Sequence, residues 1–413
     1  MLTRRNAFKA AAGLAATATV GTAGVANAAD KVIKIGLNMS FTGADAESAV
    51  RVANAAIMAF DDANSTGAIK GYKFEYVKFD DGTATAGQYD PAQAATNARK
   101  MVSDKAFVAA LGPQMSGAGK AMAPILSEGN LAIITPSSTN PDITDPKFAA
   151  QYRPAGKAIY FRTVATDAFQ GPNMANFMAK TLKIKSVYVL DDSGAYGVGI
   201  ADAFQAQIEK NGVKVLGRDR LDPKAVDYAA VLTKIKALNP DALYFGGVGQ
   251  AGVKLVKQSY EIVPNMIKAG GDGVYSTDIL KGAGFPSFDN WYSTQASPHV
   301  TEEKGSEVFT TRFFQRFGSR PDDYAVTCYT AAQVIIQAAK DIVATGKEPT
   351  RDAMQAAIQN VSLKGSLIGT VEFDPNGDMK NKVISVFQVK KDAAKPLDDT
   401  ESQFKYVGVA PMS

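Results

Sequence analysis

Short apolar runs alternate along the chain with longer segments in which apolar residues recur every three or four positions. The short runs predict buried strands and the longer segments predict amphipathic helices. Up to residue 134, strands are expected at 32–37, 72–80, 107–111 and 131–134, and helices at 47–64, 91–103 and from Ser116 onward. Asp90 fits the cap of the second helix and Pro91 its first position. This alternation predicts a parallel, doubly wound α/β sheet.

The same order recurs in the second half of the chain and predicts a second lobe of the same architecture. Its strands are expected at 186–190, 213–217, 241–245 and 266–269, and its helices at 195–211, 227–238 and 250–262. The tail breaks this rhythm, with helices expected at 302–317, 321–344 and 351–360 and strands at 370–373 and 383–389. Helices after two finished lobes suggest that the chain returns to complete the first lobe, although periodicity alone does not derive this return.

Hydroxyl side chains gather where two strands of the first lobe end. Ser116 opens a helix shortly after the strand 107–111, and Ser137 and Thr139 follow the strand that ends at 134. Unpaired N–H groups and the positive end of the helix dipole favour an anion at a helix N-terminus. The sequence therefore predicts a carboxylate-sized pocket at this edge of the sheet. The alternative is that Ser116 and Thr139 are ordinary helix caps.

Two loops of the second lobe offer further candidates. Asp272 lies between glycines after the strand 266–269, where a carboxylate could face a cationic ligand group, or remain a solvated loop residue. Tyr196 follows a Gly-containing loop and could cover a ligand or be an exposed loop tyrosine. The pair Asp80-Asp81 has no metal ligands nearby and indicates a solvated strand end.

The segment Gly247-Val-Gly-Gln-Ala-Gly252 has the spacing of a dinucleotide-binding loop, with Asp272 twenty residues after its last glycine. The motif follows the third strand of its lobe, whereas the dinucleotide fingerprint belongs to the first strand. We therefore expect glycines that let a loop approach the cleft closely, and no bound cofactor. A dinucleotide-dependent oxidoreductase is kept as a remote alternative.

The first 28 of the 413 residues have the features of an export signal. Arg4, Arg5 and Lys9 precede a small apolar run, and residues 26–28 match a small-x-small cleavage site. The paired arginines also suggest a twin-arginine route, although Ala7 and Phe8 depart from that motif. Loss of this segment removes three positive charges and lowers the net charge from +4 to +1. A near-neutral chain gives no electrostatic reason to expect nucleic acid or an anionic membrane as partner.

Cysteine and histidine are too scarce for several kinds of chemistry. Cys328 is the only cysteine and His299 the only histidine of the chain. An internal disulfide, a lipid-bearing cysteine after the signal and the common zinc sites are thus excluded, and a cysteine–histidine catalytic pair is disfavoured. We expect a free, soluble, monomeric protein outside the cytoplasm, without metal or cofactor.

Several segments, together with the export signal, resemble the leucine/isoleucine/valine-type periplasmic binding proteins, the substrate-capturing subunits of ABC importers. They are residues 35–43, 62–64, 67–71, 77–81, 112–116, 135–141, 161–163 and 170–172. The resemblance implies two Rossmann-like lobes joined by three crossings, with the ligand held between them. It places the signal at 1–28, the N-terminal lobe at 29–166 and 297–380, and the C-terminal lobe at 167–296 and 381–413.

The resemblance also implies roles for individual residues. Ser116 and Thr139 match residues that hold the ligand carboxylate, while the Ser137 carbonyl, the Thr139 hydroxyl and Asp272 match the groups that hold the α-ammonium. Tyr196 matches a tyrosine over the ligand, and Tyr324 an aromatic residue at the edge of the cleft.

The sequence departs from the leucine-type binders at two positions of the pocket. They commonly have an aromatic residue where this chain has Ser48 and can have a tyrosine where it has Val248, so a larger amino acid fits as well as leucine. Residues 82–89 resemble an insertion near the mouth of the cleft.

We therefore expect a non-enzymatic binding protein that captures an amino acid, branched-chain or another hydrophobic one, and delivers it to an inner-membrane ABC permease from the periplasm. The alternative within the same fold is an aromatic or aliphatic carboxylate without an α-amino group.

Overall fold

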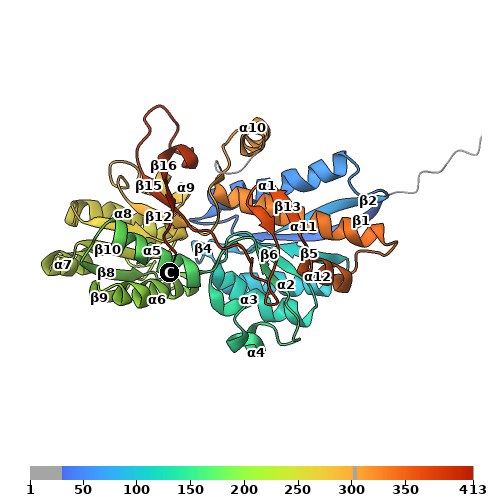
Figure 1. Cartoon of the computed structure of the whole chain (residues 1–413), viewed down its shortest axis with the longest axis horizontal. Helices are drawn as coiled ribbons and strands as arrows, with labels where there is room; N and C mark the ends of the chain where they lie inside the picture. Colours follow the sequence, from blue (N-terminus) through green and yellow to red (C-terminus); the bar gives the residue numbers. More distant parts are fainter. Residues whose placement is uncertain (1–29, 301–304, 413) are drawn as a thin grey trace, which may run out of the picture.

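A computed structural model describes residues 30–300 and 305–412, so the predicted export signal lies outside the described residues. Figure 1 shows two α/β lobes side by side, one built mainly from the blue and cyan segments and the other from the green and yellow ones. The described part of the chain contains no helix that combines the length and the apolar character needed to cross a bilayer.

The sheet of the first lobe has five parallel strands in the order β2-β1-β5-β6-β7. Their bounds are β1 Lys31–Met39, β2 Tyr72–Asp80, β5 Phe107–Leu111, β6 Ile133–Thr135 and β7 Tyr160–Arg162. Alternate residues face opposite sides, since Leu111 packs into the core on one face and Ala110 into the core on the other. The predicted doubly wound parallel sheet is therefore confirmed for this lobe.

Helices cover both faces of this sheet. Four of them share one core with β1: α1 Ala46–Ser65, α10 Ser306–Phe317, α11 Asp323–Ala344 and α12 Arg351–Gln359. The opposite face is covered by α2 Pro91–Ser103 and α3 Ser116–Glu128. The Asp90 side chain accepts from two N–H groups of the first turn of α2, which confirms the predicted cap. Because α10 to α12 belong to the tail, the chain does return to the first lobe. The predicted lobe boundaries at residues 166, 296 and 380 stay a prediction.

The sheet of the second lobe has seven strands in the order β16-β15-β12-β11-β10-β8-β9. Their bounds are β8 Ser186–Asp191, β9 Lys214–Arg220, β10 Ala242–Gly246, β11 Ile267–Gly270, β12 Tyr292–Gln295, β15 Ser385–Val389 and β16 Phe404–Val409. β15 runs antiparallel to both of its neighbours, which differs from the uniformly parallel sheet predicted from the sequence. No helical crossover of the βαβ type leads into β15, so nothing forces it to run parallel.

The remaining elements complete the two lobes. The second lobe has helices α5 Asp167–Asn176, η3 Phe177–Thr181, α6 Ala195–Lys210, α7 Ala229–Leu238, α8 Gly249–Ile262, η4 Asp272–Val274, α9 Thr277–Ala283 and α13 Thr400–Gln403. The first lobe adds β3 Gly82–Thr83, β4 Gln88–Tyr89, η1 Pro141–Ile143, η2 Pro146–Phe148, α4 Ala149–Tyr152, β13 Leu363–Ser366 and β14 Gly369–Val371. The predicted insertion 82–89 forms the β3–β4 hairpin, and its Gly87 carbonyl accepts a hydrogen bond from Gln250 of the other lobe at 3.0 Å.

The interpretation of Asp80-Asp81 as a solvated strand end is wrong for Asp81. Its side chain is buried, and its two oxygens accept from Asn38 Nδ2 at 2.6 Å and Ser40 Oγ at 2.7 Å. The parallel pairing of β1 with β2 brings the two strand ends together, so one residue at the end of β1 and one just after it satisfy the carboxylate. Burial raises the pKa of Asp81 to about 6.

Candidate functional site

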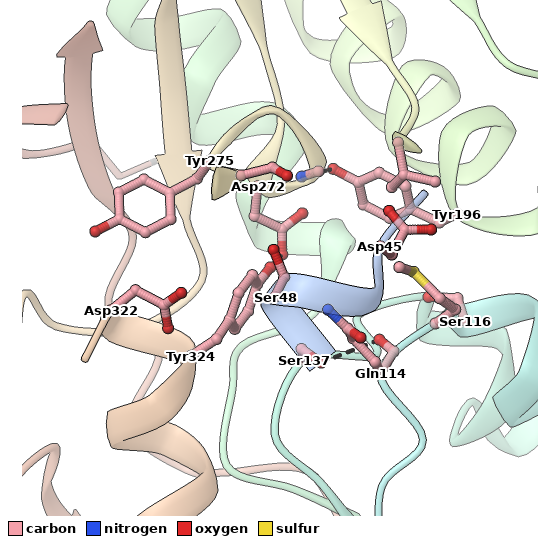
Figure 2. A pocket seen from close by; sticks show the side chains of 14 residues that line it. Asp45, Ser48, Gln114, Ser116, Ser137, Tyr196, Asp272, Tyr275, Asp322 and Tyr324 are labelled. Atoms are coloured by element: carbon pink, nitrogen blue, oxygen red, sulfur yellow. Dashed lines mark hydrogen bonds between the residues drawn. The ribbon is translucent and has the colours of Figure 1, made fainter. Parts of the chain in front are cut away.

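A cavity between the lobes encloses about 520 Å³ of space not filled by atoms, and part of it is open to solvent. Residues of both lobes line it, as Figure 2 shows. Seven of the eight site residues predicted from the sequence meet at its wall: Ser48, Ser116, Ser137, Tyr196, Val248, Asp272 and Tyr324. The wall also includes residues that the sequence did not point to, namely Asp45, Gln114, Met115, Gly273, Tyr275, Ser276 and Asp322.

Ser116 is the first residue of α3, and the helix points its N-terminus at the cavity. The residue before it, Met115, has no side chain that could cap the first-turn N–H groups. The Ser116 hydroxyl accepts a hydrogen bond from the Asn140 N–H at 3.2 Å, so its own proton is left to donate. Ser116 is therefore not a cap, and this end of the cavity offers donors to an anion.

Ser137 joins two loops of the first lobe at the cavity wall. Its hydroxyl donates to the Gln114 carbonyl at 3.0 Å, and its N–H donates to Thr135 Oγ1 at 3.3 Å. The Ser137 hydroxyl proton is thus already used inside the protein. This bond fixes the loop after β6 against the loop between β5 and α3.

Thr139 is the one predicted site residue that the structure does not place at the cavity wall. It is fully buried, its carbonyl accepts from the Asp167 N–H at 2.9 Å, and within the described residues its hydroxyl oxygen has no hydrogen-bond partner. In this arrangement Thr139 supports the wall from behind. Its direct contact with a ligand remains a prediction.

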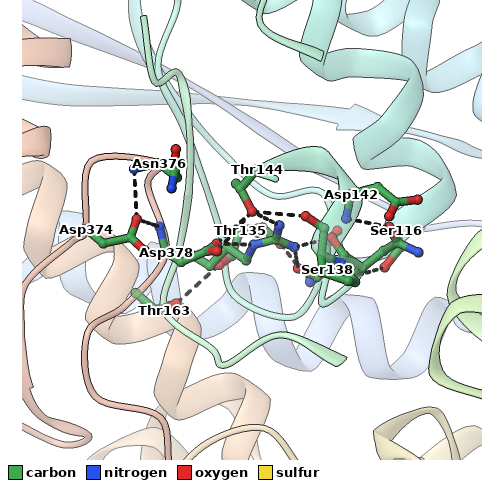
Figure 3. Close-up of polar contacts among 12 residues, drawn as sticks. Ser116, Thr135, Ser138, Asp142, Thr144, Thr163, Asp374, Asn376 and Asp378 are labelled. Atoms are coloured by element: carbon green, nitrogen blue, oxygen red, sulfur yellow. Dashed lines mark hydrogen bonds and ion pairs between the residues drawn. The ribbon is translucent and has the colours of Figure 1, made fainter. Parts of the chain in front are cut away.

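Arg162, at the end of β7, is the side chain that holds the loop after β6 in place. Figure 3 labels three of its partners, Ser138, Thr144 and Asp378. Its guanidinium is fully buried and donates to the carbonyls of Ser138 at 2.9 Å and Asn140 at 2.8 Å and to Thr144 Oγ1 at 2.6 Å. It also pairs with Asp378 at 2.8 Å. The only local signal of this role is a charged residue at the end of a short apolar strand.

Asp272 forms the acidic side of the cavity. It lies in η4, directly after β11, and its Oδ2 accepts a short hydrogen bond from the Tyr324 hydroxyl of the first lobe. Its N–H donates to Gln170 Oε1 at 3.0 Å, and within the described residues its Oδ1 lacks a hydrogen-bond partner. Burial raises the pKa of Asp272 above its ordinary value. The pKa of Asp167 is raised too, first by burial and then by the negative charge of Asp272. A cationic ligand group would relieve this cost.

Tyr196 lies at the start of α6 and is buried, so the alternative of an exposed loop tyrosine does not apply. Its hydroxyl accepts from the Gly273 N–H at 2.9 Å and thereby fixes the turn that carries Asp272. Val248 precedes α8, and its N–H donates to Asp192 Oδ2 at 3.0 Å.

The lobes are in contact across the cavity mouth. Asp278 of α9 accepts hydrogen bonds from the Glu47 N–H at 3.3 Å, the Ser48 N–H at 3.1 Å and the Ser48 hydroxyl at 2.5 Å. A carboxylate of one lobe therefore caps the N-terminus of α1 in the other, a favourable place for negative charge. Ser48, which the sequence suggested only as a small residue in a roomy pocket, also closes the cleft.

We expect Asp278→Ala to weaken ligand binding about tenfold, because the closed form loses hydrogen bonds that are worth about 1–3 kcal/mol in charge-assisted contacts. Calorimetry with the best ligand and its dissociation rate would measure this. The matched control is Lys281→Ala, which removes an exposed ion pair to Glu47 across the same mouth and should change affinity less than about threefold. Equal effects of the two variants would contradict a specific role of Asp278.

The G-x-G-x-x-G segment lies between β10 and α8, and its glycines permit close packing. A side chain at Gly247 would collide with the Phe245 ring, and one at Gly252 with Ile279. Gly249 has a φ of +52° and faces Asp45 across the lobes. Within the described residues no group of three or more His, Cys, Asp and Glu side chains is placed to hold a metal ion.

Known proteins resemble this chain over most of its length. A sequence profile described as periplasmic binding protein matches residues 32–394. The leucine-, isoleucine-, valine-, threonine-, and alanine-binding protein of Pseudomonas aeruginosa is 30% identical over 383 residues, which cover 92% of this chain and 96% of that protein.

Solved structures share the fold. A leucine-binding protein LivK from Thermotoga maritima superposes with a TM-score of 0.77 at 22% identity and covers 92% of this chain and 98% of its own. A solute-binding protein of an ABC transporter from R. palustris in complex with benzoate gives 0.74 at 19% identity and covers 92% and 97%. The family consists of binding proteins and not of enzymes. The chain belongs to the periplasmic binding protein family, as an ABC-transporter solute-binding protein related to the Leu/Ile/Val-binding proteins.

Proposed function

We propose that the protein captures an α-amino acid between its lobes and delivers it to the membrane permease of an ABC importer. The observation that supports this most directly is the chemistry of one cavity. Its first-lobe side offers the N-terminus of α3 and the Ser116 hydroxyl, while its second-lobe side offers Asp272 Oδ1, which has no hydrogen-bond partner among the described residues.

A zwitterion leaves water only if both of its charges find partners. The α-carboxylate would bind at Ser116 and the α-ammonium at Asp272, which lie on different lobes. Only the closed form brings both partners to the ligand, so binding favours closure through contacts that the open form lacks. The Tyr324–Asp272 and Asp278–Ser48 hydrogen bonds connect the lobes in that form.

Titration calorimetry of the mature protein, freed of any bound ligand, tests this proposal. The ligand series contains the common amino acids, the best binder without its amino group and the best binder without its carboxylate. We expect both truncated ligands to bind at least about a hundredfold more weakly, because each leaves one buried partner unpaired. Equal affinity for the acid without its amino group would favour the second candidate.

That second candidate is a carboxylate without an α-amino group, as in the benzoate complex of the R. palustris relative. It would use the Ser116 end alone, and Asp272 would have to stay protonated. The raised pKa of Asp272 is compatible with this. The calorimetric ligand series separates the two candidates. A zwitterion requires the charged form of Asp272, whereas a carboxylate ligand requires its neutral form.

The role of Ser116 can be measured with Ser116→Ala. We expect about a tenfold loss of affinity, because a hydrogen bond from this hydroxyl to a charged group is worth about 1.5–3 kcal/mol. The matched control is Ser127→Ala near the other end of α3. Ser127 is also buried and accepts a loop N–H, that of Ala155, at 3.2 Å, but it does not line the cavity. If both variants bind alike, the Ser116 effect is structural and the assignment fails.

A further inference from the structure

A second acidic side chain, Asp45, lines the same cavity as Asp272 from the opposite lobe (Figure 2). It is the residue immediately before α1 and is 4% exposed. Although it occupies the cap position of that helix, its side chain makes no capping hydrogen bond, because Asp278 occupies the N-terminus instead. Within the described residues its Oδ2 has no hydrogen-bond partner.

Within the described residues no positively charged group acts on Asp45. Among the described residues no ion pair includes it, and the charged groups that act on it are the carboxylates of Asp278, Asp192 and Asp81. Its two oxygens lie 3.2 and 3.3 Å from the position where a side chain at Gly249 would begin, and Gln88 Oε1 lies 3.4 Å from the same point. Gln88 Oε1 is a buried acceptor without a partner as well. Two buried acceptors thus lie close to one point, and neither has a hydrogen-bond partner within the described residues.

The third carboxylate at the cavity wall, Asp322, shows the contrast. It accepts from the Ala325 N–H at 2.8 Å as the cap of α11, and the buried Arg51 guanidinium lies 3.8 Å away. Asp322 therefore already has a donor and a counter-charge within the protein. If Asp272 receives the α-ammonium, the Asp45 carboxylate is the one acidic group at the wall that is still unmatched.

We propose that Asp45 is a subsite for a second cationic group, and that the ligand is an α-amino acid whose side chain ends in an amine or guanidinium. This inference rests on the proposed function. Ser48 and Val248 keep the space beside Asp45 open, and Tyr196 and Met115 provide apolar surface for the methylene groups of such a side chain. Burial raises the pKa of Asp45 to about 7 in the empty protein, and a bound cation would hold the carboxylate in its charged form.

The test compares L-lysine, L-ornithine and L-arginine with L-norleucine and L-leucine by calorimetry at pH 8, above the pKa of about 7 to which burial raises Asp45. Norleucine has the straight carbon chain of lysine without the terminal amine. We expect at least one basic amino acid to bind more than tenfold tighter than norleucine. Asp45→Asn should remove that preference, so that no basic amino acid binds more than about threefold tighter than norleucine. Asp341→Asn, an exposed acid near the far end of α11, is the charge-matched control and should change neither value.

The outcomes separate this inference from the function on which it rests. If leucine or norleucine binds as tightly as every basic amino acid, or if the Asp45→Asn protein keeps its preference, the second subsite is disproved while amino-acid capture stands. If no amino acid of either kind binds, both proposals fail.

Discussion

Replacement of Asp272 by asparagine is expected to lower the affinity for the best amino acid at least about a hundredfold. The substitution keeps the shape of the side chain but leaves a buried ligand ammonium without its counter-charge. Breaking a buried charge pair in this way costs about 3 kcal/mol or more, and every 1.4 kcal/mol is about a tenfold change in Kd. The asparagine side chain still offers an oxygen to the Tyr324 hydroxyl, and the backbone N–H of residue 272 still donates to Gln170 Oε1. The substitution therefore does not otherwise impair the closed form.

The same variant should not destabilise the ligand-free protein. Burial raises the pKa of Asp272 in the folded chain, so the unfolded chain loses this proton at lower pH than the folded one. The free energy of unfolding therefore falls as the pH rises above the pKa that Asp272 has in the unfolded chain. Asparagine does not ionise, so the variant lacks this loss of stability. We expect a melting temperature at pH 7 that is unchanged or higher, measured by calorimetry without ligand.

Two comparisons make this result specific. Asp202→Asn removes an exposed acid of the same lobe, with its side chain 62% exposed and paired with Arg218, and should leave affinity unchanged. The ligand without its amino group should bind to Asp272→Asn at least as well as to the natural protein. An unchanged affinity for the amino acid in Asp272→Asn would refute the assignment of the ammonium to this side chain.

The sequence was sufficient for elements whose apolar pattern is local. The strand predicted at 107–111 is β5, and the helix predicted to open at Ser116 is α3. Because parallel strands end at one edge of a sheet, the strand order along the chain also indicated that Ser116 and Ser137 would come near the cleft, whereas Thr139 of the same prediction does not line the cavity. The strand β12, with Ser293, Thr294 and Gln295, gave no apolar run, and it forms by pairing with β11 and with the distant β15.

Buried charges were the part that local pattern could not predict. Asp81 is satisfied by side chains from the end of β1, and Arg162 by Asp378, which lies 216 residues further along the chain. A buried charged residue is stable only with such partners, and their identity is set by tertiary contacts. The surroundings of Asp45 could not be predicted either, because Gly249 of the other lobe packs against it. Here the tertiary contacts leave a buried carboxylate oxygen without a partner among the described residues.

Replacement of Arg162 by methionine should destabilise the protein by about 3–5 kcal/mol. The substitution keeps an apolar stem of similar length but removes every donor from a fully buried site. Asp378 then loses its ion pair, and the carbonyls of Ser138 and Asn140 lose hydrogen bonds that water does not replace. Thermal unfolding followed by calorimetry should show a melting temperature lower by roughly 5 °C or more.

Affinity should fall as well, because Arg162 holds the loop on which the Asn140 N–H supports Ser116. The double variant Arg162→Met with Asp378→Asn tests the cause, since removing the stranded carboxylate should restore part of the lost stability. Arg312→Met is the matched control, as its side chain is 47% exposed and pairs with Asp62 at the surface, where ion pairs contribute about 0–1 kcal/mol. If Arg162→Met melts no earlier than Arg312→Met, the loop that carries Thr139 is held by its own turns and hydrogen bonds, and the buried guanidinium is dispensable.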